Sequence, residues 1–170
     1  MLAPLGMVFF LSARISKMSV STAQISFWLF AGLMGLSLSS IFLIYTGASI
    51  TQTFFVTAIA FGGLSLYGYT TKRDLTGFGS FLIMGVIGLL VASVVNIWLA
   101  SPMIQWAVSV LGVLIFAGLT AYDTQRIKEM YYVGDAAATA SKKAIMGALS
   151  LYLDFINMFM FLLQLFGNRR

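Results

Sequence analysis

Two aspartates inside apolar stretches are the residues of this chain that could carry chemistry. Asp154 lies within residues 144–166, AIMGALSLYLDFINMFMFLLQLF, which are otherwise hydrophobic and long enough to cross a bilayer. Asp123 ends the preceding apolar stretch, in TAYDTQ. A carboxylate at bilayer depth costs roughly 2.5–3.5 kcal/mol on insertion scales, so it normally faces the protein interior and serves a function. Two such acids on neighbouring membrane helices suggest cation binding, proton transfer or hydrolysis.

The two aspartates would act together only if their helices bring them into contact. Asp154 follows Ala144 by ten residues, or about 15 Å along a helix, so the last helix must begin above the membrane surface or the earlier one must tilt. Two close carboxylates in a low dielectric cannot both ionise cheaply, so they would share one proton and sense pH. When both are ionised, they would repel or bind a hard cation such as Ca²⁺, with Ser150 and Asn157 as further oxygen ligands.

A purely structural role for both acids is the alternative. In that case Asp123 pairs with Arg126 or Lys128 at the membrane edge, and Asp154 is neutral and hydrogen-bonded.

A polar stripe runs along the last apolar segment. Gly147, Ser150, Asp154, Asn157 and Gln164 recur at spacings of three and four residues, with one step left apolar, so they share one face of a helix. Such a face must contact protein or water and not lipid. It is either the hydrogen-bonded side of a core helix or the lining of a hydrophilic path.

The composition is that of a membrane protein. Of 170 residues, 60% are hydrophobic and 9% charged, and the mean hydropathy is +0.97, whereas a soluble domain carries about 25% charged residues. We therefore predict one all-α domain, a polytopic transmembrane helix bundle with a partial first helix over 1–12 and five full spans. The spans are expected at approximately 23–46, 51–71, 78–99, 103–125 and 144–166.

The first apolar stretch is too short to cross a bilayer. Residues 1–12 would cover about 18 Å as a helix, and the basic residues Arg14 and Lys17 follow the stretch where a signal peptide would have them in front. The stretch resembles the second half of a membrane helix, so we expect an N-terminally shortened version of a longer protein.

Basic residues predict the orientation of the bundle. The loops 13–22, 72–77 and 126–143 carry lysine and arginine, whereas 47–50 and 100–101 carry no charge. The positive-inside rule makes the first set cytoplasmic. A last helix that crosses fully puts the C-terminus on the other side; the final Arg169-Arg170 would instead favour a re-entrant helix. We favour the full crossing.

The residue types also exclude several functions. The chain has no cysteine and no histidine, so it lacks a thiolate nucleophile, the usual general base and the commonest transition-metal ligand. We expect no cofactor. The net charge of +5 comes from residues at loops and chain ends, which does not indicate a nucleic-acid partner.

Several motifs resemble one membrane-protein family over nearly the whole chain. AYDTQRIK (121–128) followed by GALSLYLDFINMFMFLLQLFG (147–167) is similar to the C-terminal signature of the Bax inhibitor-1 family, also called the transmembrane BAX inhibitor motif family. LMGLSLSSIFLIYTG (33–47) and SLYGYTTKRDL (65–75) resemble its bacterial members.

This resemblance implies a seven-helix protein whose last helix is central, and of which this chain would lack the first one to two helices. Bacterial members are associated with a pH-sensitive calcium leak. Eukaryotic members lie in the endoplasmic reticulum and other internal membranes, lower stored calcium and suppress cell death. The family's aspartate pair, which acts as pH sensor and gate, matches Asp123 and Asp154. Arg14 corresponds to a basic residue that latches the pair.

The resulting hypothesis is a pH-sensitive calcium leak channel or transporter and not an enzyme. Its gate would be Asp123 and Asp154, which would also be the tentative calcium ligands, with Ser150, Asn157 and Gln164 lining the path. Its partners would be the lipid bilayer, calcium ions and protons. A bacterial inner membrane is the expected location, with the endoplasmic reticulum or another organelle membrane as the alternative.

Two other functions stay open. One is a non-conducting membrane adaptor of the cell-death-suppressor type, which binds partners through the 126–143 loop. The other is an intramembrane aspartyl protease, because Tyr122-Asp123 resembles the first motif of presenilin-type enzymes. However, the second aspartate stands in LYLD where those enzymes have Gly-x-Gly-Asp, and their Pro-Ala-Leu element is absent.

Overall fold

Five helical elements have the length and composition needed to cross a membrane, which confirms the predicted all-α polytopic fold class. The computed structural model describes residues 10–170, so most of the partial helix expected over 1–12 lies outside the described residues. Residues 10–14 are helical and lead into a single turn, η1. The elements are η1 (Ile15–Lys17), α2 (Val20–Leu38), α3 (Ile41–Ile44), α4 (Gly47–Thr70), α5 (Thr76–Leu99), α6 (Pro102–Met130) and α7 (Ala137–Phe166).

Hydroxyl side chains set where several helices begin and break. Ser19, Thr46 and Ser101 cap α2, α4 and α6, each accepting a hydrogen bond from a backbone N–H of the first turn. Between α2 and α3, the hydroxyls of Ser39 and Ser40 donate back to carbonyl oxygens of the preceding turn. These bonds compete with the helical ladder, and the predicted span over 23–46 is interrupted at this point.

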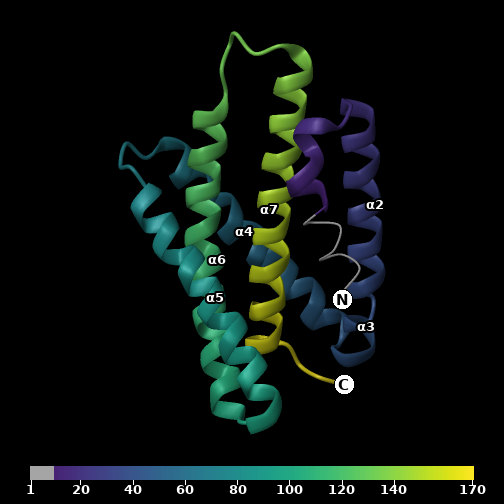
Figure 1. Cartoon of the computed structure of the whole chain (residues 1–170). Helices are drawn as coiled ribbons and strands as arrows, with labels where there is room; N and C mark the ends of the chain where they lie inside the picture. The colour runs from purple at the N-terminus through teal and green to yellow at the C-terminus, as the bar shows by residue number, and fades with distance from the viewer. Residues whose placement is uncertain (1–9) are drawn as a thin grey trace.

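Helix α7 is the central element of the bundle, as the family resemblance implies. It packs against α6, α4 and α2, and in Figure 1 it lies between α6 on one side and α2 on the other, with α4 behind it. The outward sides of α2 and α5 expose large apolar side chains, among them Trp28, Leu36, Ile97 and Trp98. A belt of this kind contacts lipid in a membrane protein.

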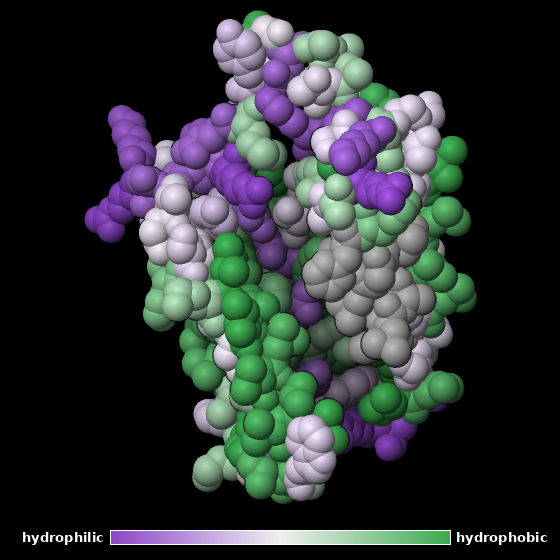
Figure 2. Space-filling model, viewed as in Figure 1, coloured by the Kyte–Doolittle hydropathy of each residue, from purple (hydrophilic) through white to green (hydrophobic). Residues whose placement is uncertain are grey.

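Hydrogen bonds join the basic connections at one end of the bundle, here called the basic end. Lys142 Nζ donates to the carbonyl oxygen of Ser16 (3.2 Å). Gln125 accepts from the Leu75 N–H (2.9 Å) and donates to the Arg73 carbonyl oxygen (2.8 Å), which ties the α4–α5 connection to α6. Hydrophilic residues gather at this end, and hydrophobic ones cover the middle (Figure 2).

The chain terminus lies at the other end of the bundle. After α7, the backbone of 168–170 hydrogen-bonds to the α3–α4 junction: Thr46 N–H donates to the Asn168 carbonyl (3.0 Å), and Arg170 N–H donates to the Ile44 carbonyl (2.8 Å). We call this segment the C-terminal strap. Helix α7 therefore runs as one continuous helix from the basic end to the opposite end.

The prediction of a loop over 126–143 is wrong in its length. Helix α6 continues to Met130 and α7 begins at Ala137, so the connection is confined to 131–136. Hydropathy falls where the charged residues begin, but Arg, Lys, Glu, Met and Ala are all strong helix formers. The helices consequently extend beyond the apolar stretches.

A glycine allows the closest helix approach near the basic end. A Cβ atom on Gly68 of α4 would overlap the backbone carbonyl oxygen of Ala121 on α6. Small residues allow such backbone contact in membrane bundles, and here the contact holds α4 against the turn of α6 that precedes Asp123.

We predict that Gly68→Ala destabilises the protein by about 1–3 kcal/mol, because the added methyl group meets backbone that cannot rotate away. The measurement is thermal unfolding of the purified chain in detergent. Gly63→Ala is the matched control, since a Cβ on Gly63 of the same helix meets nothing within 4 Å. Equal unfolding temperatures for the two variants would contradict the prediction.

Candidate functional site

The structure brings Asp123 and Asp154 together. Their carboxyl groups lie close enough to interact directly. Asp154 is buried, with 4% of its surface exposed, whereas Asp123 is half-buried. A hydrogen bond between two carboxyl groups requires a proton on one of them, so this proximity favours a shared proton.

The buried carboxyl of Asp154 lacks other donors. Its Oδ2 atom is fully buried and has no hydrogen-bond partner on the rest of the chain described by the structure. A buried carboxylate oxygen without a donor is costly. A proton or a bound cation would compensate it.

Helix packing between α6 and α7 explains why the two acids meet. Two glycines set the antiparallel register: Gly147 faces Ile127, and Gly112 faces the ring of Phe161. This register places Asp154 about one helical turn from Asp123. Helix α7 begins at Ala137, seven residues before the predicted start of the span at Ala144, and it extends beyond the end of α6 (Figure 1).

A pocket of about 380 Å³ at the basic end reaches Asp123. Asp123 and Ser150 border it, whereas Asp154 does not. The face that contains this region is hollowed, with hydrophilic residues at the bottom of the hollow (Figure 2). Among residues 10–170, the lining is Ile15, Ser16, Asp123, Arg126, Ile127, Met130, Thr139, Lys142, Lys143, Met146, Gly147 and Ser150.

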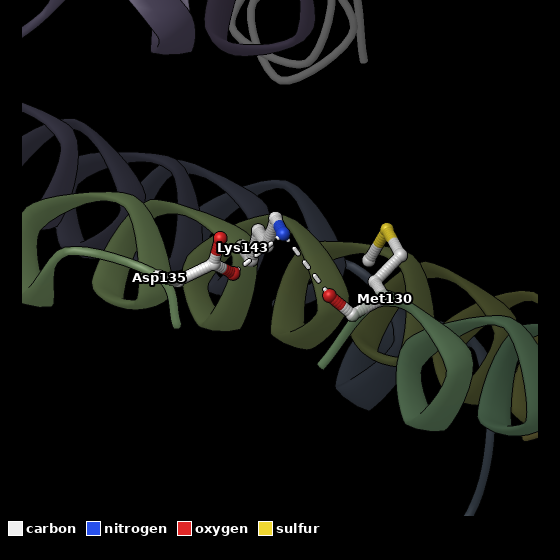
Figure 3. A network of polar contacts seen from close by, with 3 residues as sticks. All are labelled: Met130, Asp135 and Lys143. Atoms are coloured by element: carbon white, nitrogen blue, oxygen red, sulfur yellow. Dashed lines mark hydrogen bonds and ion pairs between the residues drawn. The ribbon is translucent and has the colours of Figure 1, made fainter. Parts of the chain in front are cut away.

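An ion pair fixes the connection beside this pocket. Lys143 Nζ lies 2.6 Å from Asp135 Oδ2 and 3.1 Å from the Met130 carbonyl oxygen (Figure 3). The lysine on α7 thereby holds both the end of α6 and the connection between the helices. Sequence reasoning did not identify this pair, since the two residues lie eight apart across a helix boundary that hydropathy does not reveal.

The predicted polar stripe divides into separate groups. Ser150 borders the same pocket as Asp123. Asn157 donates to the carbonyl oxygen of Leu153 in its own helix (2.8 Å). Gln164 accepts from Gln105 (2.9 Å) and from the hydroxyl of Ser109, nearer the opposite end. The stripe is therefore not a single connected chain of polar groups in this conformation.

The basic residues considered as partners of the pair lie in different places. The ion pair of Lys143 is the only one within residues 10–170, so Arg14, which is exposed, is not ion-paired to either aspartate. Lys128 donates to the Tyr69 carbonyl oxygen and lies over the Tyr69 ring. Arg126 alone lies near enough to Asp123 to interact electrostatically.

Asp123 and Asp154 have fewer oxygen ligands around them than a permanently bound calcium ion requires. No third acidic residue joins Asp123 and Asp154 among the residues that the structure describes, and Ser150 adds one hydroxyl. Calcium takes 6–8 oxygen ligands. The donor set suits a cation that keeps part of its water shell better than one held permanently.

Comparisons with known proteins agree with the motifs. The family model described as "Inhibitor of apoptosis-promoting Bax1" matches residues 1–170. The inner membrane protein YbhL of Escherichia coli K12 is 55% identical over 99% of this chain and 73% of its own length. An uncharacterized protein of Rickettsia prowazekii is 51% identical over the whole chain and 72% of its own length.

More distant bacterial relatives share the same region. A membrane protein of Streptococcus pyogenes is 38% identical over 94% of this chain and 69% of its own length. With its five membrane-length helices and its inner-membrane relative, the chain is an integral inner-membrane protein. It belongs to the Bax inhibitor-1 family.

Proposed function

We propose that the protein is a cation leak pathway, with calcium as the permeant ion, whose conduction is controlled by the shared proton of Asp123 and Asp154. The supporting observation is that the buried Asp154 lies beside Asp123, which borders the pocket at the basic end. An ion or proton that enters from the basic end meets Asp123 first and Asp154 second. By the positive-inside rule, that end faces the cytoplasm.

The proton and the cation would compete for the same two carboxyl groups. With one proton shared, the side chains attract each other and hold α6 against α7. Without it, two negative charges in a low dielectric repel each other or take up a cation. In this proposal, Arg14 acts as a latch only in a conformation other than the observed one, because it is exposed here.

Intramembrane proteolysis is less well supported by the geometry. An aspartyl protease needs space for a peptide carbonyl against both carboxyl groups, with a water between them. The pocket borders Asp123 but not Asp154. We therefore propose a pathway for ions and no enzymatic activity.

The first prediction concerns pH. Calcium flux into liposomes that contain the purified chain should vary between pH 5 and 8, and Asp154→Asn and Asp123→Asn should each remove that variation. Each variant removes one of the two coupled titrating groups and leaves side-chain size nearly unchanged. Flux in the variants with the wild-type pH profile would contradict a proton-linked gate.

Asp74→Asn is the matched control for this experiment. Asp74 is exposed in the connection between α4 and α5, and its pKa lies below the usual value because the Thr76 hydroxyl and N–H hydrogen-bond to it. It therefore stays ionised across pH 5–8. The control variant should keep the wild-type pH profile, since it loses the same charge but no group that titrates in this range.

A second prediction separates a functional role of Asp154 from a structural one. Asp154→Leu should leave the unfolding temperature in detergent unchanged or raised, because it removes a buried polar atom that lacks a partner, a penalty of about 1–3 kcal/mol. The same variant should lose pH-dependent flux. A fall of several degrees in unfolding temperature would instead show that the carboxyl pair mainly stabilises the bundle.

A further inference from the structure

The mouth of the pocket above the aspartates is unusually basic for a route that carries cations. Arg126, Lys142 and Lys143 line it, against the single carboxylate of Asp123. Arg126 belongs to the end of α6 and the lysines to the start of α7, so the positive charges converge on the pocket from two helices.

Two of these three cations have donor capacity left for a ligand. Lys143 is compensated by Asp135 at 2.6 Å. Lys142 donates to one neutral acceptor, the Ser16 carbonyl oxygen, and an ammonium group has three donors. Arg126 is exposed, carries five N–H donors and takes part in no ion pair within residues 10–170.

The walls of the same pocket are apolar. Ile15, Ile127, Met130 and Met146 line it together with the cations. The pocket lies at the end of two helices of membrane-spanning length, which is the level at which lipid headgroups meet acyl chains. Positive groups beside an apolar wall at this depth match the phosphate and the upper acyl chain of one phospholipid.

We propose that this pocket binds an anionic phospholipid of the leaflet at the basic end. Arg126 and Lys142 hold the phosphate, and Ile15 and Met130 contact the acyl chain. Asp123 at the bottom repels the phosphate, which keeps the headgroup at the mouth between the two cations. Basic pockets between membrane helices on the cytoplasmic side recognise anionic headgroups in this way. The binding requires no conduction, so it goes beyond the proposed leak function.

The test is competitive lipid retention by the full chain. The protein is purified in detergent and incubated with equal amounts of phosphatidylglycerol and phosphatidylcholine, and bound lipid is counted by native mass spectrometry. We expect phosphatidylglycerol to be retained preferentially, and Arg126→Gln/Lys142→Gln to lower its retention about tenfold or more. Because the experiment measures bound lipid and not ion flux, it can support the lipid site even if the protein conducts no ions.

Three further variants make the result specific. Lys72→Gln/Arg73→Gln removes the same charge from exposed residues at the same end and should leave retention unchanged. The charge-preserving exchange Arg126→Lys/Lys142→Arg should retain the lipid, and Lys142→Gln alone should show a partial loss. The single variant and the exchange decide the question if the double glutamine variant fails to fold.

Three outcomes would overturn the proposal. Equal loss in the Lys72/Arg73 control would show diffuse attraction of anionic lipid to the whole basic end. Equal retention of phosphatidylcholine would show an apolar groove without headgroup selection. Displacement of phosphatidylglycerol by millimolar inorganic phosphate, with phosphate itself retained, would identify a site for a free anion in place of a lipid.

Discussion

The contact between the two carboxyl groups is the constraint on which the rest of the structure depends. A buried acid beside another acid is tolerable only with a proton or a cation present, so α6 and α7 must be held together by other interactions. Tight helix packing supplies them: Gly147 against Ile127 and Gly112 against Phe161 bring the helices close. The neighbouring turn of α6 is held in turn by α4, because Gly68 lies directly against Ala121.

Much of the fold follows from hydropathy, but the site follows from it only in part. The apolar stretches predicted the membrane helices, and the cost of a charge in lipid singled out Asp123 and Asp154. Hydropathy alone did not predict the contact between them, because α7 starts at Ala137, before the apolar stretch begins, and only the family resemblance implied a pair. The family was assigned from the motifs AYDTQRIK and LYLDFIN. Such an assignment depends on which residues are present, and the hydropathy pattern alone does not provide it.

The polar residues on one face of α7 predicted the arrangement of the site less well than the two aspartates did. Ser150, Asn157 and Gln164 share a face of α7, yet Ser150 borders the pocket, Asn157 bonds within α7, and Gln164 bonds to α6. The basic residues of the expected loop were also misjudged. They were assigned to topology, with Arg126 and Lys128 also considered as partners of Asp123, whereas in the structure Arg126 and Lys142 on the extended helices line the same pocket as Asp123. One short region thus combines orientation signals with the chemistry of the site.

Helix α7 is fastened at both of its ends. The ion pair of Lys143 with Asp135 holds its start, and the C-terminal strap holds its end, with the Arg169 guanidinium 5.9 Å from the centre of the Tyr45 ring. A rod clamped at both ends resists translation along its axis but can still rotate or bow between the clamps. Asp154 lies between these two fixed points, so a motion that separated it from Asp123 would have to be a twist or lateral bend of the middle of α7 and not a translation along its axis.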